Sequence, residues 1–234
     1  GLYAIKDQAF DLVTQRMRSG DPVTELEVQD AMAGWFEDAG LVSDSRPVVA
    51  AQENAGDPHY LPTRDRHRVI GSDEVLLLDL WGKLRTPRAV YADITWMGYT
   101  GTTVPAQYAD AFTVICEGRD AAVTLVQRVT REGGELRGWE VDRAARGLIA
   151  AAGFGDRFVH RTGHSLGEEV HGNGVHLDDF ETHDERRLLP GTGLTIEPGV
   201  YFEDFGLRTE INLHVGHRSA TVTGPLQTKI RTLR

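Results

Sequence analysis

The sequence predicts a mixed α+β fold built from two similar halves. Two amphipathic segments followed by two strand-like apolar segments occur once in the first 100 residues and once again after them. No low-complexity tract or flexible linker divides the chain. Because the order helix, helix, strand, strand occurs twice, we expect residues 1–234 to form one domain with pseudo-twofold symmetry around an antiparallel sheet.

The first half begins with two predicted helices. Residues 3–19 carry apolar side chains at helical spacing, and Gly20 is a typical helix end. Thr24 and Glu27 have the spacing of a capping box, which predicts a second helix that extends to about Ala39.

Strands follow the first helix pair. Residues 47–52 are expected to be extended, and residues 74–82 and 89–97 read as two strands. A turn around residues 84–88 would join these two strands into a hairpin.

The second half repeats this order. A long helix is predicted over residues 106–131, ended by Gly133, and a second helix over residues 140–152. After an irregular region rich in His, residues 193–202 and 207–215 are predicted to form another hairpin.

Composition excludes several classes of protein. The 234 residues include 25 Lys plus Arg and 35 Asp plus Glu, so the net charge of −10 argues against nucleic acid or an anionic membrane as partner. The lone Cys116 excludes an internal disulfide framework and a Cys-based zinc site. The longest strictly apolar run, Leu148 to Ala152, is too short to span a bilayer. With no secretory signal in the sequence, we expect a cytoplasmic location.

Each predicted hairpin carries one acid on each strand. A single acid in such a strand is best explained as pointing to solvent, because alternate residues do. Four acids in apolar strands are a different matter, since a buried carboxylate is costly unless it is paired or bound to a cation. We therefore interpret this set as a candidate site for one or two divalent cations: Asp79, Asp93, Glu197 and Glu210.

The His-rich region would add nitrogen ligands. His160, His164 and His171 lie among glycines, which permit close approach of the backbone to a crowded site. His59, between Pro58 and Tyr60, is a weaker candidate. For the remaining candidates a role outside the site is the better interpretation: His176, His183, His214 and His217.

Together these motifs resemble the M24 metallopeptidases, the "pita-bread" enzymes that include methionine aminopeptidase, prolidase and Xaa-Pro aminopeptidase. The resemblance covers the whole chain. It rests on Pro-His59-Tyr, on Asp79 with Asp93 in Ala-Asp-Ile-Thr, on the His-x-x-Gly-His164 segment with His171, on Thr-Ile-Glu197-Pro-Gly-Val-Tyr and on Leu-Arg208-Thr-Glu210. The sequence Glu-Pro-Gly-Val-Tyr is more similar to the proline-specific branch than to the methionine branch.

The resemblance implies a curved antiparallel sheet and two divalent metal ions. Mn is the first choice, and Co, Zn and Fe(II) are compatible. The implied metal ligands are Asp79, Asp93, His164, Glu197 and Glu210. Glu197, His59 and His171 would be catalytic; His59, His160 and His171 would bind substrate; Arg208 would hold a ligand carboxylate.

The implied function is hydrolysis of the N-terminal peptide bond of short peptides, Xaa-Pro in particular, by a water that the two ions share. A homodimer is expected only as the commonest assembly. The N-terminal domain usual in prolidases is expected to be absent. Within the family, a methionine-aminopeptidase-like activity or a creatinase-like or binding role is an alternative; a plain acidic interaction domain is the alternative outside it.

Some residues depart from the family pattern. Asp79 and Asp93 are fourteen residues apart, further than is usual, and the extra residues are expected in the turn at 84–88. Trp81, Trp96 and the Ile211-Asn212 pair also differ, which affects the choice of substrate more than metal binding. The sequence leaves open which Trp lines the pocket.

Overall fold

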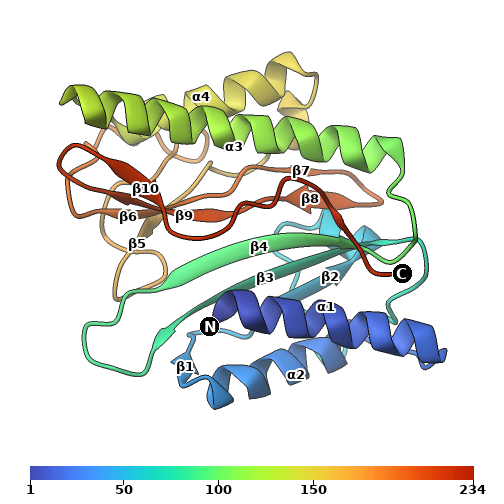
Figure 1. Cartoon of the computed structure of the whole chain (residues 1–234). Helices are drawn as coiled ribbons and strands as arrows, with labels where there is room; N and C mark the ends of the chain where they lie inside the picture. Colours follow the sequence, from blue (N-terminus) through green and yellow to red (C-terminus); the bar gives the residue numbers. More distant parts are fainter.

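The computed structural model describes residues 1–234 as two helix pairs with β-sheets between them (Figure 1). None of its helices has the length and apolar character needed to span a membrane. The helices are α1 Leu2–Ser19, α2 Glu25–Asp38, α3 Ala106–Glu132 and α4 Gly138–Ala151, with short 3-10 turns at Gln52–Gly56 and Gly155–Arg157. The strands are β1 Leu41–Val42, β2 Val48–Ala51, β3 Val75–Leu84, β4 Ala92–Tyr99, β5 Ser165–Leu166, β6 Gly193–Ile196, β7 Gly199–Tyr201, β8 Gly206–Arg208, β9 Ile211–Val215, β10 Ala220–Val222 and β11 Arg231–Thr232.

The helix ends follow the local sequence. The side chain of Thr24 accepts a hydrogen bond from the backbone of Glu27, whose carboxylate accepts one from the Thr24 backbone, so the predicted capping box is confirmed. Gly20 and Gly133 end α1 and α3 in the left-handed conformation, with φ of 77° and 73°. α4 begins two residues earlier than predicted, at Gly138 rather than Glu140.

The first sheet has the order β1-β3-β4-β11, and β2 also pairs with β3. Alternate residues of its strands point to opposite faces, and Leu78, Leu80 and Ile94 pack on the face covered by α1 and α2. Asp79 therefore faces the other way, into the interior between the sheets. Asp79 pairs with Thr95 and Trp81 with Asp93, so these four side chains share the inner face.

The second sheet has the order β10-β9-β6-β5. Leu194 and Ile196 of β6 pack with Ile211 and Leu213 of β9 in the core under α3 and α4. The alternate residues face inward, toward the first sheet (Figure 1). A helix pair thus covers one face of each sheet, and the other face of the sheet points toward the centre of the molecule.

The predicted strands 193–202 and 207–215 are each interrupted, which corrects the prediction. Pro198 has no N–H to donate to a ladder, and the N–H of Glu197 bonds to the carbonyl of Thr162 instead of a strand. Opposite the break, the N–H of Glu210 bonds to the carbonyl of Thr95 across the two sheets at 3.3 Å. β7 and β8 consequently form a separate ribbon, and Glu197 and Glu210 lie at its junctions with β6 and β9.

The β3–β4 hairpin is also displaced from its prediction, because β4 begins at Ala92 rather than at residue 89. The N–H of Tyr91 bonds to the carbonyl of Gly167 instead of β3. The connection at residues 85–91 accommodates the long spacing between the two acids, which still share one face.

The free edge of β4 is closed by two side-chain amides. Asn212 accepts from the Asp93 N–H at 2.9 Å and donates to the Asp93 carbonyl at 2.6 Å. Gln227 bonds in the same way to the N–H and carbonyl of Met97, at 2.8 and 2.7 Å. These two amide clamps join the two halves of the fold and satisfy buried backbone groups that no strand reaches.

Candidate metal centre and cavity

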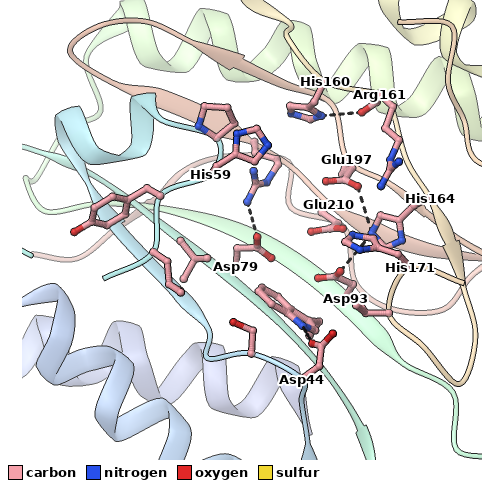
Figure 2. A pocket seen from close by; sticks show the side chains of 18 of the residues that line it. Asp44, His59, Asp79, Asp93, His160, Arg161, His164, His171, Glu197 and Glu210 are labelled. Atoms are coloured by element: carbon pink, nitrogen blue, oxygen red, sulfur yellow. Dashed lines mark hydrogen bonds and ion pairs between the residues drawn. The ribbon is translucent and has the colours of Figure 1, made fainter. Parts of the chain in front are cut away.

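A cavity of about 510 Å³ opens between the two sheets (Figure 2). All nine residues singled out as site candidates line it: His59, Asp79, Asp93, His160, His164, His171, Glu197, Arg208 and Glu210. The four histidines assigned no role in the site do not: His176, His183, His214 and His217.

Three of these side chains meet at the buried end of the cavity. Asp93, His164 and Glu210 each offer a ligand atom, and the three atoms lie within 4.8 Å of one another. Glu197 is adjacent, with its Oε1 3.5 Å from His164 Nε2, the same distance that separates Nε2 from Asp93 Oδ2. Both halves of the chain therefore supply this cluster: Asp93 lies in β4, and the other three residues lie next to the ends of strands in the second half.

The ring of His164 is oriented by its other nitrogen. Nδ1 lies 3.2 Å from the carbonyl of Ser165, to which it donates, so Nε2 faces the carboxylates. Burial lowers the pKa of His164, but the bond to Asp93 and the charge of Glu197 outweigh it, and the pKa lies above its usual value. The acids that raise this pKa would equally favour a cation beside Nε2.

Asp79 lies beside this cluster and is held by Arg208. Nη2 of Arg208 donates to Asp79 Oδ2 at 2.5 Å, while its Nε donates to the Thr95 hydroxyl and its Nη1 to the Tyr201 hydroxyl, both at 3.0 Å. Thr95 in turn donates to Glu210 Oε2 at 2.8 Å. One guanidinium therefore fixes one candidate ligand directly and a second through a hydroxyl.

The acids are too crowded to be charged together without a cation. Burial raises the pKa of Asp79 to about 7, with Arg208 opposing the shift and the charges of Asp93 and Glu197 adding to it. Burial and the neighbouring acids also hold the pKa of Glu210 well above its usual range. Three buried carboxylate oxygens have no hydrogen-bond partner in the protein: Asp79 Oδ1, Asp93 Oδ1 and Glu210 Oε1.

Glu197 differs from the other acids because it faces more positive neighbours. Burial pushes its pKa up, but His164, His160 and Arg208 outweigh that effect, so the pKa of Glu197 lies below its usual value. The hydroxyl of Thr195 donates to Glu197 Oε1 at 3.2 Å and accepts from the His164 N–H at 2.9 Å.

Sequence reasoning missed the two threonines. Thr95 follows Asp93 by two residues and Thr195 precedes Glu197 by two, so each lies on the inner face of its strand beside an acid. A period of two counted from the acids would have found both.

The other histidines at the cavity differ in whether their ring nitrogens are already hydrogen-bonded within the protein. His160 uses both ring nitrogens: Nδ1 donates to the Arg161 carbonyl at 2.7 Å, and Nε2 lies 2.8 Å from the Tyr201 hydroxyl. Burial lowers the pKa of His160 to about 4, so it is neutral. His171, which is exposed, has its ring centre 4.5 Å from that of His164, and His59 faces the cavity from the opposite rim (Figure 2).

Trp81 and Trp96 lie on opposite faces of the first sheet. Trp81 lines the cavity, and its indole N–H donates to Asp44 Oδ1 at 2.6 Å. Trp96 lies under Lys6 of α1, whose Nζ is 3.9 Å from the ring centre. Asp44 and Arg161 also line the cavity, and sequence reasoning missed them as candidate site residues because both come from irregular loops.

Fold and site together define a class: a two-halved α+β protein with a buried carboxylate–histidine cluster, open to a cavity, that could hold metal. The sequence model of metallopeptidase family M24 matches residues 3–217, so the chain belongs to that family.

Relatives and solved structures agree with this assignment. The chain is 28% identical over 214 residues to a Xaa-Pro dipeptidase of Lactobacillus helveticus, which covers 90% of this chain and 53% of that protein. It is 26% identical to dipeptidase PepE of Mycobacterium ulcerans, with a TM-score of 0.78 over 97% of this chain and 57% of that one. X-Pro aminopeptidase of Thermotoga maritima, 22% identical, shares the fold with a TM-score of 0.80 over 98% and 60% of the two chains.

These matches confirm the pita-bread fold that the sequence motifs predicted. The chain spans about half the length of the curated relatives it matches.

Proposed function

We propose that this chain binds two divalent metal ions and hydrolyses the N-terminal peptide bond of short peptides with proline in the second position. The observation that carries the proposal is the set of unpartnered, buried carboxylate oxygens of Asp79, Asp93 and Glu210 beside the inward-facing Nε2 of His164. Buried carboxylate oxygens without partners are destabilising unless a cation compensates them. The proposed ligands are Asp79, Asp93, His164, Glu197 and Glu210.

The donor set fits such ions. Carboxylate oxygens and one imidazole nitrogen suit Mn, Co, Zn and Fe(II), and Mn is our first choice. The bond from His164 Nδ1 to a backbone carbonyl is the usual way in which a metal-binding His is oriented. When bound, two ions would polarise the scissile carbonyl and lower the pKa of a water molecule.

The remaining side chains have separate tasks. Partial removal of the imidazole from water at the cavity wall, together with the charges of His164 and Arg161, lowers the pKa of His171. A neutral His171 donates a hydrogen bond to the oxyanion that forms as the carbonyl becomes tetrahedral. Glu197 transfers the proton to the leaving amine. His59 contacts the substrate from the opposite rim, and Arg208 holds Asp79 in place.

The predicted role of His160 in substrate binding is narrowed, because its ring nitrogens do not bond to the substrate. Because both ring nitrogens are already bonded, it presents its ring to the substrate and holds the Tyr201 hydroxyl.

The preference for proline rests on the relatives. The Lactobacillus helveticus protein is named a Xaa-Pro dipeptidase, and the wording of the motifs around Glu197 and Glu210 is similar to that branch. The cytoplasmic location and the homodimer remain predictions.

A cleavage panel tests the proposal. The purified chain is stripped with chelator and reloaded separately with Mn, Co, Zn or Fe(II). It is then given Xaa-Pro dipeptides, Xaa-Pro-Xaa tripeptides, Met-Ala-type tripeptides and an N-acetylated control, with products identified by mass spectrometry. We expect metal-dependent loss of one residue from the free Xaa-Pro peptides. Exclusive cleavage of the Met peptides would move the chain to the methionine branch, and silence with every metal would contradict the proposal.

A further inference from the structure

Trp81 forms a wall of the cavity that begins at the candidate metal centre. It follows Asp79 by two residues on the same face of β3 and pairs directly with Asp93 of β4. Side chains of such a cross-strand pair lie about 5 Å apart at Cβ. The indole therefore starts beside two of the proposed ligands and extends away from them along the cavity, toward Asp44.

Asp44, in the loop between β1 and β2, ends this wall. Its Oδ1 accepts the indole N–H at 2.6 Å, which fixes the ring. The Asp44 side chain is exposed and lines the cavity, and no Lys, Arg or His forms an ion pair with it. The neighbouring Arg46 is paired with Asp30 instead.

Lys83, two residues after Trp81 on β3, is also engaged elsewhere. Its Nζ donates to the carbonyl of Glu168 and lies 4.9 Å from the ring centre of Tyr91. It does not line the cavity. Asp44 is thus an acid without a counter-ion at the end of an aromatic wall.

We propose that Trp81 and Asp44 form a subsite for a positively charged side chain, so that the preferred substrates begin with Lys or Arg. The proposal rests on the proposed peptidase function. Tryptophan is the side chain whose ring face attracts cations best, and the carboxylate at its end adds a direct ionic partner. The opposite side of the acid cluster differs, because Arg161 lies there and faces Glu181 at 3.8 Å (Figure 2).

The position of the wall assigns the subsite to the N-terminal residue. When the scissile carbonyl lies at Asp93, His164 and Glu210, the residue that carries this carbonyl can lie beside the start of the indole, because Trp81 pairs directly with Asp93. Its side chain can then follow the ring to Asp44.

Selectivity between isosteric peptides tests the subsite. We expect kcat/KM for Lys-Pro to exceed that for norleucine-Pro by about 3–30-fold, the combined effect of one cation–π contact and one exposed ion pair. The ratio should fall at high salt. Asp44→Asn should lower the ratio to about 2–5-fold, the part that the cation–π contact with Trp81 retains. Asp110→Asn, which removes the same charge from an exposed position on α3 outside the cavity, should keep it.

A binding measurement keeps the test independent of turnover. In the zinc-loaded, ¹⁵N-labelled chain, the indole N–H signal of Trp81 is identified by its loss in Trp81→Phe. We expect L-lysinamide to shift this signal more than L-norleucinamide, and Asp44→Asn to reduce the difference.

The outcomes separate the two proposals. Equal shifts by the two amides, a ratio near one in the wild type, or a preference for Glu-Pro would overturn the cationic subsite. If no peptide is cleaved while lysinamide still shifts Trp81 selectively, the peptidase proposal fails and the subsite stands.

Discussion

The amide clamp of Asn212 on Asp93 offers a sharp test of how the metal centre is held. Asn212→Leu keeps the side-chain volume but removes both hydrogen bonds to the Asp93 backbone. Gln227→Met removes the corresponding pair at Met97, four residues along the same strand and away from the acids, together with one bond to the Lys229 carbonyl at 2.9 Å. The two variants therefore lose the same kind of contact, and only one of them loses it at a proposed ligand.

Both variants should be destabilised by a similar amount. Each leaves a buried N–H and a buried carbonyl without their partner, at about 1–3 kcal/mol for each group. Because water and relaxation recover part of this cost, we expect the free energy of unfolding of the metal-free protein to fall by about 2–4 kcal/mol in each case.

The response to metal should differ between them. Loss of a contact that orients a ligand typically weakens metal affinity by about 10–100-fold. At a fixed excess of metal this removes about 1.4–2.8 kcal/mol of metal-linked stability. For a chain of this size, that corresponds to a metal-induced rise in Tm smaller by about 3–11 °C in Asn212→Leu. Gln227→Met should retain the wild-type rise.

Thermal unfolding with and without Mn, together with calorimetric titration of the metal, provides the assay. An equal loss of the metal-induced rise in both variants would show that the clamps act only on overall stability. A full wild-type rise in Asn212→Leu would refute the inference that Asn212 positions Asp93.

Three further predictions follow from the contacts around the site. The Nδ1 of His176 accepts a hydrogen bond from the Ser165 N–H, and burial lowers the pKa of His176 to about 4, so its contribution to stability is present above pH 6.5 and is lost as the pH falls toward 4. In urea unfolding, the difference in the free energy of unfolding between pH 7 and pH 5 should be smaller in His176→Asn than in the wild type, and an unchanged difference would contradict this. Arg208→Met removes the partner of Asp79 and raises its pKa further, so calorimetry at pH 7 should show metal affinity weaker by about 10–100-fold, whereas unchanged affinity would mean that Arg208 does not position Asp79. Trp96→Leu, on the outer face of β4, should lower the free energy of unfolding by about 1–3 kcal/mol and leave metal affinity as it is; a loss of affinity would place Trp96 at the site.

Much of the fold could be predicted because its signals are local. Apolar spacing placed the helices, and Thr24 with Glu27 marked one helix start. The breaks at Glu197 and Glu210 were not predicted, although Pro198 indicated one of them. What decided the breaks is tertiary: the backbone at both acids bonds to segments distant in the sequence.

The site residues that lie in regular strands could be predicted from the alternation of side chains along a strand. Counting by two from Asp79 places Trp81 in the cavity, and counting from Asp93 places Thr95 on the inner face beside the acids and Trp96 on the other face. Asp44 and Arg161 come from irregular segments, whose side chains have no such period. Their positions depend on how the loops pack around the cavity, which the sequence pattern does not encode.

The number of metal ions bound by the wild type and by Asp93→Ala tests the central claim most directly. Native mass spectrometry after loading with Mn should find two ions on the wild type and none retained by Asp93→Ala, with circular dichroism confirming that the variant keeps its helices. A wild type that binds no metal, or an Asp93→Ala variant that binds two ions as the wild type does, would contradict the account.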